Sequence, residues 1–246
     1  MKRRAVQREI MALKKINHPN IIKLHDLIET QKQICMITDY ISGISLNQYV
    51  KTQCPNRVVK EATCRKFFKQ IVEGFDYLHQ KGIAHRDIKL DNILIEEKTK
   101  MIKIIDFGFA CFIREPSGQR QRHKIFCGTP SYMCPEIVRK HEYDGQCVDL
   151  WALGVLLYAM LTGQFPFRGS SENELYMRIQ RGIFKYPTDS LSKEARYVVS
   201  KLIVVDPSSR MRTSTLLKES KWVGCQDLPM SIFENAGSIY RASSVD

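Results

Sequence analysis

A nearly unbroken apolar segment, residues 150–161, constrains the fold more than any other part of this sequence. A helix formed by these residues is apolar on every side, so other elements have to surround it. The segment falls short of the roughly 20 apolar residues that cross a bilayer, and we expect no membrane span. Residues 2–4 are basic and precede an amphipathic pattern, so we expect no signal peptide. The sequence therefore predicts a globular protein with a buried central helix.

Composition and charge argue against several classes of protein. A content of 43% hydrophobic and 26% charged residues is typical of soluble globular proteins. The net charge of +12 favours contact with phosphate, acidic proteins or anionic membranes, but the basic residues are spread along the chain. No Arg/Lys stripe alternates with aromatic residues, so we expect no specific nucleic-acid partner. Eight cysteines without a close CxxC pair indicate reduced thiols, and we expect a cytoplasmic protein, with the nucleus as the alternative.

The densest polar cluster is the stretch HRDIKLDN at residues 85–92, which lies between a predicted helix and the apolar run 93–95. Its spacing places a potential base, Asp87, a cation, Lys89, and an oxygen ligand, Asn92, on one short loop. So many polar groups between apolar elements indicate a functional site. Each residue taken alone has a plainer interpretation, as a hydrogen-bonding loop residue or a surface cation.

A second carboxylate, Asp106, follows where an apolar strand pattern ends in IIDFG, residues 104–108. HRDIKLDN followed by this DFG resembles the catalytic loop and metal-binding turn of eukaryotic protein kinases, and CPE at residues 134–136 lies where the family has Ala-Pro-Glu. The resemblance covers roughly residues 3–222. Residues 126–130 and 149–151 are similar to those of calmodulin-dependent and AMP-activated kinases.

The resemblance implies an α+β fold with two lobes. We expect a kinase domain at residues 1–222, with a truncated small lobe at 1–40 and a mostly α-helical large lobe at 42–222. Residues 223–246 lack helical periodicity and are rich in Ser, Gly and Asn, so we expect a tail without regular structure.

The resemblance also implies the roles of the motif residues. Asp87 would orient the hydroxyl of a protein substrate, and Lys89 would neutralise the transferring phosphoryl group. Asn92 and Asp106 would hold Mg²⁺, so the implied cofactors are ATP and Mg²⁺. Lys89 together with Thr129 resembles the serine/threonine branch, in which the substrate is a protein Ser or Thr.

Further residues are implied to bind the nucleotide. Glu9, in an Arg-Glu-Ile pattern before HPN at residues 18–20, resembles the helix glutamate that pairs with the lysine gripping the α/β-phosphates. Residues 38–43 resemble the hinge between the lobes, where backbone groups meet adenine. The adenine-binding candidates are Thr38 as gatekeeper, Asp39, Ile41 and, on the opposite side of the pocket, Leu94.

The sequence departs from the family at its start, because it contains no GxGxxG loop and no lysine strand before Glu9. We expect the 246 residues to be an N-terminally incomplete kinase product with weak or no activity of its own. The alternative is a non-catalytic scaffold or binding module, which would leave an apolar edge around residues 21–40 for a partner.

The second departure is Ile125, at the position where the family usually has a phosphorylated Ser or Thr. Nearby basic residues are then left without that phosphate: Arg86, Arg120, Arg122 and Lys124. The loop would be ordered by an acidic regulatory partner, by phospho-Ser117, or not at all.

Periodicity predicts the elements that carry these motifs. Residues 3–16 form an amphipathic helix, 21–27 and 33–40 form strands, and 61–81 form a long helix. Asp149 is predicted to cap the central helix, and the resemblance gives it the task of holding the catalytic loop. By the same resemblance, Arg210 would form a buried two-bond ion pair with Glu136.

Overall fold

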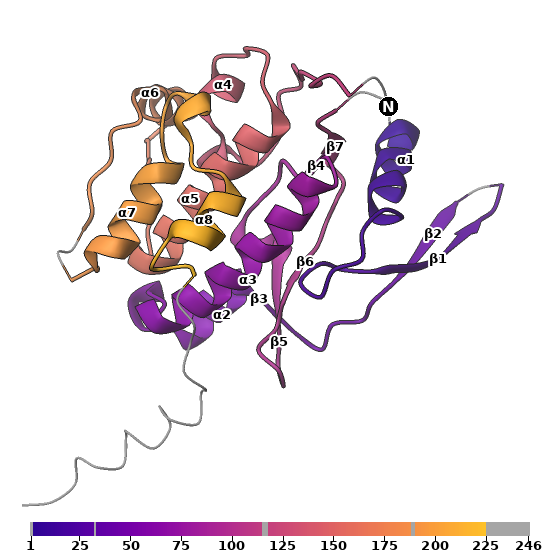
Figure 1. Cartoon of the computed structure of the whole chain (residues 1–246), viewed down its shortest axis with the longest axis horizontal. Coiled ribbons are helices and arrows are strands. Elements are labelled where there is room, and N and C mark those ends of the chain that lie inside the picture. The colour runs from indigo at the N-terminus through magenta and orange to yellow at the C-terminus, as the bar shows by residue number, and fades with distance from the viewer. Residues whose placement is uncertain (1, 32, 115–117, 188–189, 225–246) are drawn as a thin grey trace, which may run out of the picture.

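The computed structural model describes residues 2–31, 33–114, 118–187 and 190–224 (Figure 1). Its first elements are α1 (Lys2–Leu13), β1 (Leu24–Glu29) and β2 (Ile34–Thr38), and the β1–β2 hairpin projects away from the helical body. The remaining elements are β3 (Gly43–Ser45), α2 (Leu46–Gln53), α3 (Glu61–Gln80), β4 (Ile83–Ala84), β5 (Ile93–Glu96), β6 (Ile102–Ile104), β7 (Cys111–Phe112), α4 (Pro135–Val138), α5 (Gly145–Thr162), α6 (Glu172–Arg181), α7 (Lys193–Leu202) and α8 (Thr213–Glu219).

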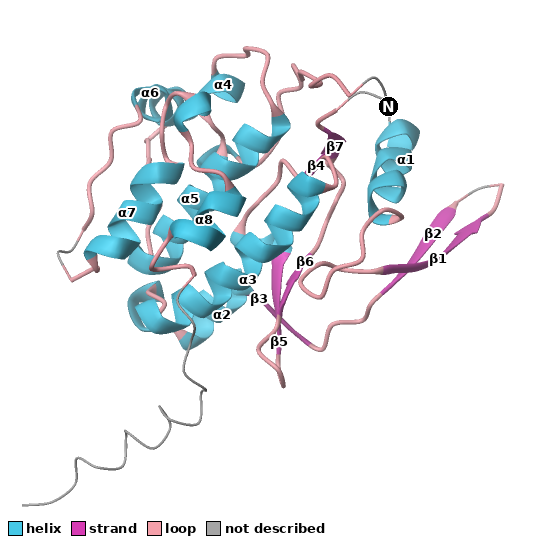
Figure 2. Cartoon of the chain, in the orientation of Figure 1, coloured by secondary structure: helices cyan, strands magenta, loops and turns pink. Residues whose placement is uncertain are grey.

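Helices dominate, and the strands form small antiparallel sheets with the orders β1-β2, β3-β5-β6 and β4-β7. Figure 2 shows that, apart from α1, the helices gather on one side of β3-β5-β6. This arrangement confirms the predicted α+β class. The division into lobes at residues 1–40 and 42–222 stays a prediction, and one hydrophobic cluster runs from Leu13 and Ile21 into the helical body. Ser117 and residues 225–246 of the predicted tail lie outside the described residues, whereas Val223 is buried.

The central helix α5 is buried along nearly its whole length. By length and composition it could span a membrane, but 89% of it is buried inside the protein, as in a core helix. Gly154 lets α5 approach α7 closely, because a Cβ there would lie 2.7 Å from the Cβ of Leu202. The predicted cap was wrong: α5 begins one turn earlier, at Gly145, and Asp144 caps it by accepting from the backbone N–H of Gln146. Asp149 lies inside the helix.

Helix α3 agrees with the periodicity of its sequence. Its inward face is fully or almost fully buried and consists of Phe67, Ile71, Phe75 and Leu78. Gly74 brings the helix against β6, since a Cβ at this position would lie 2.6 Å from Cδ1 of Ile104. The helix stops before Gly82, whose φ of 72° is in the left-handed region that glycine adopts without strain.

The N-terminal region differs from prediction in its boundaries. Helix α1 ends at Leu13 and buries Ile10 and Leu13, while Val6 is half-buried. The first strand begins at Leu24 and not at Ile21, because Ile21 is 1% exposed and makes an isolated parallel bridge to Ile104 of β6. Burial against β6 thus removes the start of the apolar run from the β1–β2 hairpin.

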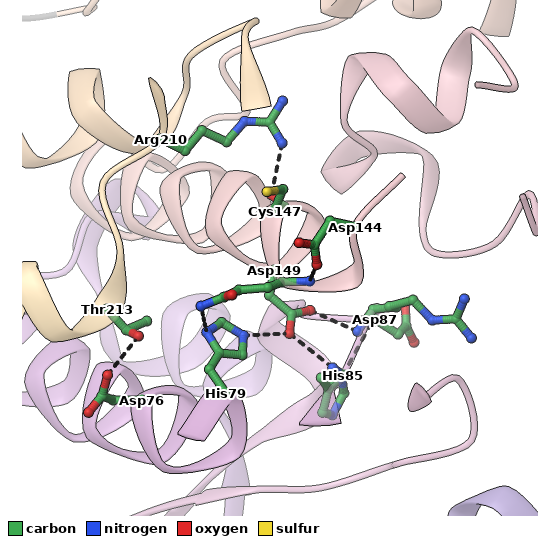
Figure 3. Close-up of polar contacts among 11 residues, drawn as sticks. Asp76, His79, His85, Asp87, Asp144, Cys147, Asp149, Arg210 and Thr213 are labelled. Carbon is green, nitrogen blue, oxygen red and sulfur yellow. Dashed lines mark hydrogen bonds and ion pairs between the residues drawn. The ribbon is translucent and has the colours of Figure 1, made fainter. Parts of the chain in front are cut away.

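A buried ion pair joins the C-terminal part of the chain to α4 and α5. Arg210 donates to both carboxylate oxygens of Glu136, at 2.8 and 2.7 Å, which confirms the predicted two-bond pair. Its Nη1 also donates to the carbonyl of Cys147 at 2.8 Å (Figure 3), and its guanidinium lies 5.1 Å from the ring centroid of Trp151. Arg210 is 4% exposed, so the charge is shielded from water and depends on these partners.

We predict that Arg210→Met lowers the free energy of unfolding by about 3–5 kcal/mol, because it leaves the Glu136 carboxylate buried without a cation. The double variant Arg210→Met/Glu136→Leu should recover most of this loss, since it removes both charges. Urea denaturation of the two variants measures both effects. Arg178→Met, which breaks the exposed pair with Glu174, is the control and should cost less than about 1 kcal/mol. An equal loss of unfolding free energy in Arg210→Met and Arg178→Met would contradict the stabilising role given to the buried Arg210–Glu136 pair.

Candidate active site

The carboxylate of Asp149 holds the polar loop, residues 85–92, against the central helix. It accepts from the backbone N–H groups of His85 at 2.9 Å and Arg86 at 2.8 Å, and it contacts Nε2 of His79 on α3 at 3.0 Å (Figure 3). Asp149 is fully buried, so these bonds replace the water that an ionised carboxylate needs. The backbone at Arg86 has a φ of 64°, an uncommon conformation for a side chain other than glycine, which the anchored loop maintains.

Three side-chain donors converge on Asp87 in this loop. Its Oδ2 accepts from Nζ of Lys89 at 2.7 Å and from Nδ2 of Asn92 at 3.1 Å, and its Oδ1 accepts from Oγ1 of Thr129 at 3.0 Å. Asp87 is 3% exposed, and the carboxylate is thereby fixed in orientation. The structure therefore brings together both predicted catalytic residues with Asn92 and Thr129.

The strand register places the two predicted metal ligands at adjacent strand ends. Ile93 of β5 pairs with Ile104 of β6, and the backbone N–H of Ile105 donates to the carbonyl of Asn92 at 3.0 Å. Asn92 precedes β5 and Asp106 follows β6, so both lie at the same end of this hairpin. Asn92 donates through its nitrogen to Asp87, which leaves its amide oxygen available. Asp106 is exposed, and its Oδ1 accepts from the N–H of Gly108 at 3.2 Å.

Glu9 on α1 faces this end of the hairpin. It is half-buried, and a Cβ placed on Gly108 would lie 4.0 Å from its Oε2. Burial, followed by repulsion from the Asp106 carboxylate, raises the pKa of Glu9 above its ordinary 4.5, while a hydrogen bond from the backbone of Phe107 partly opposes this shift. Two carboxylates that repel each other across a gap form a place where a cation would be stabilised.

The predicted adenine-binding residues make fewer polar contacts with one another than the residues around Asp87 do. Thr38 ends β2, and its Oγ1 donates to the carbonyl of Asp39 at 3.4 Å. The Asp39 carboxylate meets Nε2 of His25 at 2.6 Å and Nζ of Lys103 at 3.4 Å, so its side chain ties this segment to β1 and β6. The apolar candidates are half-buried: Ile41 and Leu94.

Residues 1–223 match the sequence model of the protein kinase domain. The chain belongs to the protein kinase family. Among its curated relatives, the protein named Probable serine/threonine-protein kinase HSL1 of Saccharomyces cerevisiae is 37% identical over 228 residues. CBL-interacting protein kinase 3 of Oryza sativa subsp. japonica is 33% identical over 214 residues, and Probable serine/threonine-protein kinase MARK-A of Dictyostelium discoideum is 37% identical over 205.

These names confirm the sequence-based expectation of a serine/threonine protein kinase domain. The matches cover 92%, 87% and 83% of this chain, respectively, but only 14%, 47% and 18% of the three relatives. The chain therefore spans less than half the length of each of them.

Two residues of the kinase domain that sequence reasoning missed are tyrosines. The hydroxyl of Tyr132 accepts from the backbone N–H of Leu90 at 3.2 Å and so supports the polar loop. Tyr143 meets Arg86, which the sequence analysis left without a partner: Nη1 of Arg86 donates to its hydroxyl at 3.0 Å. No local pattern marks either tyrosine, because their partners lie 42 and 57 residues away in the chain.

Tyr143 also ties down the segment that contains Ile125. Its hydroxyl donates to the carbonyl of Ile125 at 2.7 Å, and its backbone exchanges two hydrogen bonds with His123, at 2.9 and 2.8 Å. Burial raises the pKa of Tyr143, so the hydroxyl keeps the proton that it donates. Arg86 further donates through Nε to the carbonyl of Phe109 at 2.8 Å. The hydrogen-bond acceptors of Arg86 are thus two neutral groups of the chain, the Tyr143 hydroxyl and the Phe109 carbonyl.

We predict that Tyr143→Phe lowers the free energy of local opening of residues 123–127 by about 1.5–3 kcal/mol. The variant lacks the hydroxyl that donates to the carbonyl of Ile125 and accepts from the charged Arg86. Hydrogen–deuterium exchange of this segment measures the change. Tyr197→Phe, at an exposed tyrosine, is the matched control. Unchanged exchange in Tyr143→Phe would show that the hydroxyl does not order the segment.

The raised pKa of Glu9 gives a prediction for stability against pH. A carboxyl group whose pKa is higher in the folded state contributes stability below its ordinary 4.5 that is lost as the pH rises through the folded-state value. Glu9→Gln mimics the protonated form, so the variant should be more stable than the parent at pH 7 and equally stable below pH 4.5. Thermal denaturation at several pH values measures the difference. Glu97→Gln, at an exposed glutamate, is the matched control. A Glu9→Gln protein that is less stable than the parent at pH 7 would contradict the prediction.

Proposed function

We propose that this domain is the catalytic domain of a serine/threonine protein kinase that transfers the γ-phosphoryl group of ATP to Ser and Thr hydroxyls of proteins. One observation carries the proposal: the Asp87 carboxylate is buried and held by Lys89, Asn92 and Thr129 at 2.7–3.1 Å. Phosphoryl transfer depends mainly on positioning and charge neutralisation, which such an arrangement supplies.

Each of these residues has a chemical task in the proposal. Asp87 orients the substrate hydroxyl and accepts its proton, for which a carboxylate of fixed orientation is suited. Lys89 lies 2.7 Å from Asp87 and neutralises charge that develops on the phosphoryl group. The bond from Thr129 to Asp87 supports the Ser/Thr assignment made from the sequence, because it places this threonine beside the reacting hydroxyl.

The donor set at the hairpin end fits Mg²⁺. Asn92 and Asp106 offer an amide oxygen and a carboxylate, the hard oxygen ligands that Mg²⁺ prefers. Among the described residues, no group of three or more His, Cys, Asp or Glu side chains could hold a metal alone. This agrees with Mg²⁺ chemistry in kinases, where few protein ligands act together with nucleotide phosphates. Asn92 and Asp106 would hold the ion, which would neutralise charge on those phosphates.

For ATP we propose contacts from the hinge segment and the hairpin. The backbone of residues 38–41 would meet adenine, with Thr38 behind it and the half-buried Leu94 on the other side. The Asp39 side chain is already bound to His25 and Lys103, which leaves its backbone for the nucleotide. Glu9 would pair with a phosphate-gripping lysine, for which the 246 residues contain no recognisable motif.

The cellular setting is also a proposal. Reduced cysteines favour the cytoplasm, with the nucleus as the alternative. One relative is named as a CBL-interacting kinase, and by analogy we propose a regulatory protein partner for this domain.

A second candidate function is a kinase-like scaffold. It is favoured by the apolar side chains exposed on and next to the β1–β2 hairpin, where Ile28 is 51%, Ile37 43% and Tyr40 92% exposed. A two-stranded sheet with exposed edges can pair with further strands or with a partner protein.

We predict that two variants separate the tasks of the site in the full-length gene product. Asp87→Asn should lower phosphoryl transfer to Ser/Thr peptides by about 10²–10⁴-fold, as expected for the loss of a general base, and should keep Mg²⁺-dependent ATP binding. Asp106→Ala should lose that binding, because a metal ligand is removed. Calorimetry measures ATP binding, and peptide assays measure transfer.

Asp26→Asn is the matched control, since this carboxylate is exposed on β1 and accepts only from a neighbouring backbone N–H in the described structure. A folded parent protein that binds Mg-ATP but phosphorylates no Ser or Thr would overturn the kinase proposal. The scaffold would then remain.

A further inference from the structure

A groove of about 370 Å³ lies beside the candidate active site, between α2, the polar loop and the C-terminal end of α5. Thr129 lines it, and the same side chain donates to Asp87 at 3.0 Å. A peptide that presents its hydroxyl to Asp87 therefore passes the mouth of this groove. Successive residues of an extended peptide advance about 3.3 Å, so a residue close to the target hydroxyl can reach into it.

The walls and the rim of the groove have different character. Apolar and aromatic side chains form its walls: Val50, Leu90, Tyr132, Ala159 and Phe165. Its rim carries two exposed cations, Lys51 on α2 and Arg57 on the following turn, which we call the cationic rim. Neither cation forms an ion pair with a carboxylate in the described part of the chain.

The turn that carries Arg57 is fixed in place. Asn56 and Arg57 have φ values of 53° and 62°, an uncommon conformation for two successive residues with side chains. The turn packs on Gly163 at the end of α5, where a Cβ would lie 2.6 Å from the carbonyl oxygen of Asn56. The next segment is bonded to the same helix, from the N–H of Val59 to the carbonyl of Met160 at 2.9 Å. Arg57 is thus presented at the groove by packed backbone.

One acid, Asp91, also lines the groove. Asp91 accepts from Nδ2 of Asn47 at 2.6 Å. Lys51 follows Asn47 by four residues on α2, so both lie on one face of the helix. Asp91 belongs to the polar loop, so the acid lies on the side of the groove that this loop forms. The two cations come from other elements, Lys51 from α2 and Arg57 from the following turn.

We propose that this groove selects substrates with an anionic side chain near the target Ser or Thr, bound with its stem on the apolar wall and its charge at the cationic rim. Glutamate and phosphoserine share this chemistry. The proposal rests on the kinase function proposed above and adds a substrate class to it. An arginine at the same position of the substrate would be repelled by Lys51 and Arg57.

The test uses full-length protein and serine peptides in which each flanking position carries Glu, phosphoserine, Gln or Arg in turn. At one position, Glu or phosphoserine should raise kcat/KM about three- to ten-fold over Gln through a lower KM, the scale of exposed charge pairs. The advantage should shrink in high salt. If only phosphoserine raises kcat/KM, the groove selects a phosphate. If Glu and phosphoserine both raise it, the groove selects an anion of either kind.

The variant Lys51→Glu/Arg57→Glu should invert the preference, so that the Arg peptide has the lower KM. Lys98→Glu/Lys218→Glu changes the net charge equally at exposed sites outside the groove and should keep the parent preference. A parent protein that treats Glu, phosphoserine and Gln alike, or a preference that survives the rim variant, would overturn the proposal.

Binding of the same peptides with Ala in place of the target Ser, followed by fluorescence anisotropy, needs no phosphoryl transfer. Tighter binding of anionic peptides by the parent protein and not by the rim variant supports the groove even without turnover. Selective binding without turnover would refute the proposed kinase function and leave the groove proposal standing. Absence of any such difference in binding would refute the groove proposal whether or not the protein is active.

Discussion

The buried carboxylate of Asp149 is the interaction on which the site depends. It lies inside the most apolar helix of the described structure, where an ionised group without partners would be strongly destabilising. Its partners are two backbone N–H groups of the polar loop and the ring of His79. Because burial makes these bonds obligatory, the loop cannot leave α5 without exposing or orphaning a charge. The position of Asp87, one residue beyond the anchored pair, follows from this constraint.

The same helix supports a second buried charge at its other side. The guanidinium of Arg210 bonds Glu136 on α4 and the carbonyl of Cys147 on α5, and it lies against Trp151. Two polar networks are therefore bonded to helix α5: Asp149 bonds the polar loop, and Arg210 bonds the C-terminal part of the chain. Apolar packing positions the helix in the core, and the two networks fix how the loop and the C-terminal part lie against it.

The motif residues of the site could be found from the sequence because they are close together in it. Asp87, Lys89 and Asn92 lie within six positions, and the strand ends that place Asn92 near Asp106 follow from a short hairpin. Tyr143 could not be found, because its contact with Arg86 joins segments 57 residues apart and a tyrosine in a helix-start region has no special pattern. The cap was misassigned because the unbroken apolar run begins only after Asp149, whereas the helix begins one turn earlier, at Gly145, and has the polar Gln146 in its first turn. The start of β1 was misplaced because periodicity does not report that Ile21 pairs with β6.

The contact between Arg86 and Tyr143 uses a group that belongs to the chain itself. A phosphate can be added and removed during the lifetime of a protein, whereas a tyrosine side chain is encoded by the gene and is present from synthesis onward. A phosphatase has nothing to cleave at this contact. The Arg86–Tyr143 contact is therefore in place as soon as the chain has folded, and it holds Arg86 and the backbone at Ile125 without any added group.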